Sequence, residues 1–79
     1  MSTLDDLKAC FVETFALEPG ADPAGLVYQG IAAWDSVGHM VLVAAIETKF
    51  DVMLSTADIL DMSDFGKAVE ILRKHGVAL

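Results

Sequence analysis

The chain has 79 residues, of which 54% are hydrophobic, and its formal net charge is −7 at pH 7. A chain of this length builds one small core, so we expect residues 1–79 to form a single domain without a substrate-enclosing cleft. The negative charge argues against nucleic acid and anionic membranes as partners, because both attract Lys and Arg.

Membrane insertion and secretion are disfavoured as well. The longest apolar run, residues 40–46, is far shorter than the ~20 residues that span a bilayer. The N-terminus is acidic, whereas a signal peptide begins with basic residues and continues with an apolar stretch. Cys10 is the only cysteine and cannot form an internal disulfide, which fits a reducing compartment. We therefore expect a monomer in the cytoplasm.

An amphipathic helix is predicted near the start of the chain. Its apolar side chains recur at steps of three and four residues and are Leu4, Leu7, Phe11 and Phe15. Ser2 or Thr3 can cap its N-terminus. Glu18, Pro19 and Gly20 are predicted to end it, because proline cannot continue a helix and glycine tolerates the chain reversal.

A long loop is predicted next, over residues 18–35, where prolines and glycines recur. A loop of this length in a small domain either packs its side chains onto the core or has a function. We expect Tyr28 and Trp34 to anchor the loop on the core and not to form a ligand cage.

A second helix is predicted over residues 36–50. Its inward face comprises His39, Leu42, Val43, Ile46 and Phe50. Ser55 or Thr56 then begins a short helix.

The last helix is expected to start with Ser63 as its cap and to end near Gly76. Its apolar stripe is Phe65, Ala68, Val69 and Leu72. No segment has a convincing strand pattern. The pattern therefore predicts an all-α fold: a small helical bundle of three longer helices and one short helix, with a long first loop.

Ser36 is the most informative side chain, because it stands where the long loop meets the second helix. Backbone N–H groups and the positive end of the helix dipole favour a phosphate attached to or near a hydroxyl at such a junction. Serine before a helix is, however, most often an N-cap. The residues alone leave both interpretations open.

The tripeptide Asp35-Ser36-Val37 resembles the Asp-Ser-Leu signature of acyl carrier proteins, with valine in place of the usual leucine. The resemblance extends through residues 46–52 and 54–59 and into the helix after Ser63, so it covers nearly the whole chain. Residues 34–39 look more like free-standing carriers of specialised metabolism than like the housekeeping fatty-acid carrier.

This resemblance implies a non-catalytic protein that carries 4′-phosphopantetheine covalently on Ser36. A phosphopantetheinyl transferase would transfer the group from coenzyme A, and Asp35 would contact the transferase-bound magnesium and the phosphate. The thiol of the arm would hold an acyl group as a thioester and deliver it to acyl-activating, acyltransferase or synthase enzymes of fatty-acid-like, polyketide or other specialised biosynthesis.

The second helix would also be the main docking surface for these partners. The residues expected to contact partners are Val37, Met40, Val41, Ala44, Glu47, Asp58 and Asp61. The first four form an outward apolar strip, whereas the corresponding helix of familiar carriers is rich in carboxylates. Electrostatic steering would then depend on Asp35, Asp51, Asp58, Asp61 and Asp64. We infer a dedicated set of partners and poor coupling to general fatty-acid synthases.

Two alternatives to an acyl carrier remain at the level of sequence. One is a peptidyl or D-alanyl carrier, which shares the fold and the modified serine. The other is a helical adaptor that bears no prosthetic group and acts only by protein contact.

His39 lies one turn after Ser36, which suggests a nucleophile–base pair, but a structural or partner-contact role is favoured because no third orienting group is evident. Gly38 either allows close approach of the arm or a partner or is merely tolerated. Two histidines and one cysteine do not make a zinc site.

Overall fold

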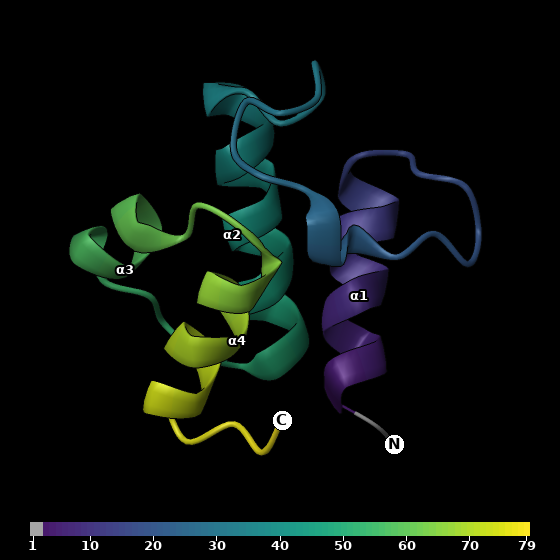
Figure 1. The fold of residues 1–79 in the computed structure, drawn as a ribbon. Helices are drawn as coiled ribbons and strands as arrows, with labels where there is room; N and C mark the ends of the chain where they lie inside the picture. Colours follow the sequence, from purple (N-terminus) through teal and green to yellow (C-terminus); the bar gives the residue numbers. More distant parts are fainter. Residues whose placement is uncertain (1–2) are drawn as a thin grey trace.

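The computed structural model describes residues 3–79 and confirms the all-α fold (Figure 1). Within these residues the elements are α1 (Thr3–Thr14), a 3-10 turn η1 (Pro23–Gly25), α2 (Ser36–Phe50), α3 (Thr56–Asp61) and α4 (Phe65–Lys74). The one β-type pairing among them is an isolated antiparallel bridge between Val27 and Asp64. Three longer helices, one short helix and a long first loop are therefore observed. The predicted cap at Ser2 lies outside the described residues.

Helices α1 and α2 run side by side, α4 lies in front of the lower part of α2, and α3 is set to one side (Figure 1). The loop between α1 and α2 returns over the bundle, and its η1 turn contacts both α1 and α4. None of the described helices is long and apolar enough to cross a membrane.

The core combines side chains from all three longer helices with several side chains of the connecting segments. Its buried members include Leu7 and Phe11 of α1, Leu42 and Ile46 of α2, and Phe65 and Leu72 of α4. Trp34 of the loop is fully buried among them. The Trp34 ring meets that of Phe11 edge-on at 5.5 Å between centroids. The loop is thus anchored on the core by Trp34, as predicted, whereas Tyr28 stays partly exposed.

Helix α1 ends earlier than the proline at position 19 predicts. Ala16 takes a left-handed conformation, with φ of 52°. The Leu17 N–H donates to the Val12 carbonyl at 2.9 Å, the six-to-one closure of a Schellman turn. The reversal is therefore complete before Pro19.

The last helix is capped by Asp64 and not by Ser63, contrary to the sequence prediction. The Lys67 N–H donates to Asp64 Oδ1 at 2.8 Å. Ser63 instead offers its backbone carbonyl to the Tyr28 N–H at 2.8 Å, which fastens the long loop to the segment between α3 and α4. The C-terminal end of α4 agrees with the prediction, since Gly76 reverses the chain with φ of 88°.

Candidate functional site

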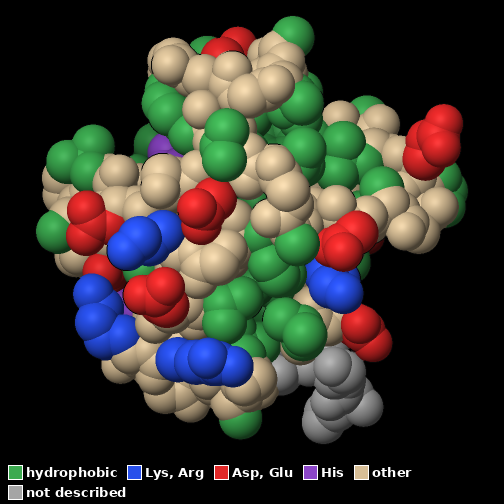
Figure 2. All heavy atoms as spheres, viewed as in Figure 1, with side chains coloured by type: hydrophobic (Ala, Val, Ile, Leu, Met, Phe, Trp, Pro, Cys, Tyr) green, Lys and Arg blue, Asp and Glu red, His purple; other side chains and the backbone are tan. Residues whose placement is uncertain are grey.

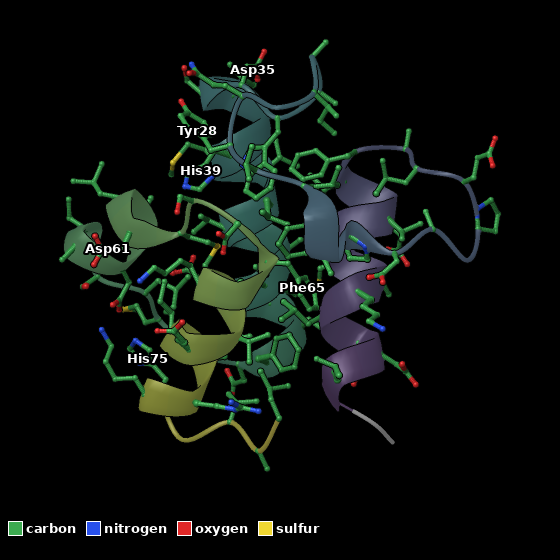
Figure 3. The ribbon with its side chains drawn as sticks, viewed as in Figure 1. Tyr28, Asp35, His39, Asp61, Phe65 and His75 are labelled. Atoms are coloured by element: carbon green, nitrogen blue, oxygen red, sulfur yellow. The ribbon has the colours of Figure 1, made fainter. Side chains whose placement is uncertain are left out.

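The N-terminus of α2 begins with an aspartate cap. Asp35 has extended backbone geometry, and its Oδ1 accepts the Gly38 N–H at 2.7 Å. Ser36 is the first residue inside the helix and is exposed. The capping role that competes for Ser36 in the sequence is therefore filled by Asp35, which marks this end of the bundle in Figure 3, and the neighbouring Ser36 is exposed.

Gly38 permits a close approach of the chain to itself. A Cβ atom at this position would lie 2.0 Å from the Ala33 carbonyl oxygen and 3.3 Å from Asp35 Oδ1. The loop backbone thus rests directly on the first turn of α2, and only glycine leaves room for it. The structural reason for Gly38 is this contact within the chain.

His39 joins the loop to α3. The Trp34 indole N–H donates to His39 Nδ1 at 2.9 Å, and His39 Nε2 lies 2.7 Å from the Ile59 carbonyl oxygen. An indole nitrogen only donates and a carbonyl oxygen only accepts, so the neutral ring with its hydrogen on Nε2 satisfies both partners. Both ring nitrogens are therefore occupied, and His39 has the structural role that the sequence favoured over a base for Ser36.

A small cleft borders the His39 ring. It holds about 110 Å³ and lies between the loop at Tyr28 and the residues Ile59, Leu60 and Met62. Tyr28 and His39 meet at 5.2 Å between ring centroids, with their planes 60° apart (Figure 3). The cleft is small, and its lining is mostly apolar.

The apolar strip predicted on α2 faces outward. Val37 is 73% exposed, Met40 52% and Val41 51%, and Ala44 is exposed as well. In Figure 2 the end of the molecule that carries Asp35, at the top, is mostly hydrophobic and neutral, whereas charged side chains gather lower down. An open hollow of about 430 Å³ between α1 and α2 continues the strip beside Val41 and Ala44.

Cys10 borders the same hollow but is almost fully buried. Burial raises the pKa of its thiol, which keeps the sulfur protonated and unreactive. Cys10 therefore behaves as a small buried apolar residue.

Glu47 and Asp61 have different environments. Asp61 is exposed at the end of α3, as a steering carboxylate requires. Glu47 is half-buried, and its Oε2 accepts the Leu54 N–H at 2.9 Å. Glu47 therefore fastens the turn after α2 to the helix itself.

Asp58 was predicted to contact partners, and this prediction is wrong. Its side chain is only 3% exposed, and it bonds to Lys74 and to His75 Nε2, the latter at 2.7 Å. Ser55 and Asp58 also form a reciprocal capping box at the start of α3. Hydrogen bonds from Lys74 first, and then from His75, hold the pKa of Asp58 well below its usual range. The carboxylate is an internal link between α3 and α4.

Periodicity could not reveal these links. The Trp34–His39 bond spans five residues, and Asp58 meets residues 16 and 17 positions further on. The one available signal was the concentration of basic residues at the end of α4.

No family model, curated protein or solved structure matches the chain. Function is therefore argued from the geometry at Ser36 together with the sequence resemblance.

Proposed function

We propose that the protein is a stand-alone acyl carrier protein that bears 4′-phosphopantetheine on Ser36 and has no catalytic activity of its own. The observation that carries the proposal is the assignment of the cap to Asp35, which leaves the Ser36 hydroxyl exposed at the first position of α2. A phosphodiester at this position benefits from the positive end of the helix dipole.

The modification is a phosphoryl transfer. The Ser36 oxygen attacks the phosphorus of coenzyme A that bears the pantetheine, and a new oxygen–phosphorus bond forms. The pyrophosphate bond breaks, 3′,5′-ADP leaves with the electron pair, and the serine proton passes to a base of the transferase. The acid–base groups belong to the transferase, and this chain contributes a rigid, exposed nucleophile.

The arm then carries an acyl group as a thioester on its terminal thiol. A flexible tether raises the effective concentration of this group at each partner's site without any further binding contact. The strip of Val37, Met40, Val41 and Ala44 supports docking of partners beside the arm, and its lack of charge supports a dedicated set of partners. Among the acidic residues expected to contact partners, Asp61 remains exposed, whereas Asp58 is buried.

Intact-mass spectrometry after incubation with coenzyme A and a broad-specificity transferase tests the proposal. The wild type and the Ser63→Ala control should gain the mass of one phosphopantetheine, while Ser36→Ala should not. Ser63 is exposed and uses only its backbone in contacts, so it is a matched control. A folded wild type that stays unmodified by a transferase active on another carrier overturns the proposal and favours the adaptor alternative.

The nature of the cargo is tested separately on the modified protein. Loading by an acyl-activating enzyme, without loading by an amino-acid-activating enzyme, is the expected result. The reverse result would assign the protein to the peptidyl or D-alanyl carriers and leave the role of Ser36 intact.

A further inference from the structure

We propose that His39 is a positioning residue for the modification of Ser36 and acts through Trp34. This inference rests on the proposed carrier function. Ser36 lies between the two residues of the Trp34–His39 hydrogen bond, so that bond spans the junction where the loop becomes a helix. Its effect is to hold the serine and its cap in one geometry before the transferase binds.

The loop side of this junction has its own fixed geometry. The Gln29 N–H donates to the Trp34 carbonyl at 2.8 Å, and the Trp34 N–H donates to the Ile31 carbonyl at 3.1 Å. The Trp34 ring is fully buried, with its plane 17° from that of His39. Trp34 therefore connects a folded loop to α2, and the bond to His39 joins the two as one unit.

The other ring nitrogen of His39 sets the orientation of the imidazole. The bond from Nε2 to the Ile59 carbonyl ties the ring to α3 and leaves Nδ1 as an acceptor directed at the indole. To keep both contacts, a side chain at this position has to place an acceptor where Nδ1 lies and a donor where Nε2 lies. Histidine supplies both, whereas asparagine reaches only the first position and glutamine only the second.

The expected consequence is a change in KM of the transferase and not in kcat. Without the Trp34–His39 bond, the transferase has to order the segment of Trp34, Asp35 and Ser36 when it binds, and this cost weakens binding. The reacting groups in the bound complex remain the same, so kcat is retained. We expect a rise in KM of about three- to tenfold for a loss of this kind.

Steady-state modification of His39→Ala, His39→Gln and His39→Asn tests the inference. His39→Ala and His39→Gln remove the acceptor for the indole and should raise KM. His39→Asn keeps that acceptor and should stay within about twofold of the wild type. Ile71→Val, a buried change in α4 away from this junction, is the stability control and should leave KM unchanged.

A spectroscopic readout reports the same bond without any transferase. The chain has one tryptophan, so the ¹⁵N-labelled protein gives a single indole N–H signal. This signal should keep its hydrogen-bonded position in His39→Asn and move upfield in His39→Gln and His39→Ala. Trp34→Phe, which removes the donor, should raise KM as His39→Gln does.

The possible outcomes separate the two proposals. A wild type that is never modified overturns the carrier function and this inference with it. A modified wild type whose His39 variants keep the wild-type KM, or in which Ile71→Val raises KM as much as the His39 variants do, overturns the positioning role alone. A higher KM for His39→Gln and His39→Ala than for His39→Asn, together with the matching shifts of the indole signal, supports the positioning role.

Discussion

Asp58 Oδ2 lies 2.7 Å from His75 Nε2, and this contact joins the first turn of α3 to the residue that ends α4. Helix α3 has only six residues, too few to be stable alone. Polar contacts hold it on two sides. Asp58 of α3 bonds to His75 at the end of α4, and His39 of α2 bonds to the Ile59 carbonyl of α3. The position of α3 therefore depends on a buried carboxylate that is ionised.

The lowered pKa of Asp58 predicts an acid-sensitive fold. A carboxyl whose pKa is lower in the folded state stabilises the protein fully above its ordinary value of 3.8. That stabilisation is lost as the pH falls through and below this value. Between pH 5 and pH 3 the urea midpoint of the wild type should fall more than that of Asp58→Asn, which should already be the less stable protein at pH 5.

Asp61→Asn is the control for this pH dependence, because Asp61 is an exposed carboxylate on the same helix. The urea midpoint of Asp61→Asn should match that of the wild type at both pH values. Equal falls of the urea midpoint in the wild type and in Asp58→Asn would contradict the stabilising role of the Asp58 carboxylate.

The assignment of the α2 cap to Asp35 predicts a clear difference between two substitutions. Asp35→Ala removes the acceptor for the Gly38 N–H and should cost about 1 kcal/mol of stability, whereas Asp35→Asn should retain most of it. Ser36→Ala should change stability by less than about 0.5 kcal/mol, as exposed positions do. Urea unfolding measures all three. A large loss in Ser36→Ala would mean that the serine is the cap.

Gly38→Ala should destabilise the protein, although alanine is the better helix former. The added Cβ would lie 2.0 Å from the Ala33 carbonyl oxygen, and forced crowding of this kind costs about 1–3 kcal/mol. Gly66→Ala in α4 is the matched control, since its nearest contact would be an ordinary 3.4 Å. It should gain up to about 1 kcal/mol from helix propensity. Equal gains in both variants would show that the loop does not rest on α2.

The uncharged strip on α2 predicts docking that depends little on salt. Met40→Ser should raise the transferase KM with almost no loss of stability, because Met40 is half exposed. Raising the salt from about 50 to 500 mM should change the wild-type kcat/KM only slightly, since exposed charges are strongly screened over that range and the strip has none. Thr48→Ser, on the exposed face of α2 further from Ser36, serves as the control. A steep salt dependence would assign docking to the carboxylates instead.

Local patterns in the sequence predicted most of the fold. The spacing of Leu42, Val43 and Ile46 identified the inward face of α2, and both ends of this helix are where they were predicted. The outward strip followed from the same periodicity, because a helix that buries one face exposes the opposite one. The end of α1 and the cap of α4 were misplaced, since several neighbouring residues could fill each role.

The sequence by itself determined the helices, the face that each one buries and the prominence of Ser36, because these depend on residues three or four positions apart. Only the tertiary structure decided that Asp58 is buried and that His39 links the loop to α3. Each of these depends on which donor or acceptor packing brings within about 3 Å, and hydrogen bonds of that length are not encoded in periodicity.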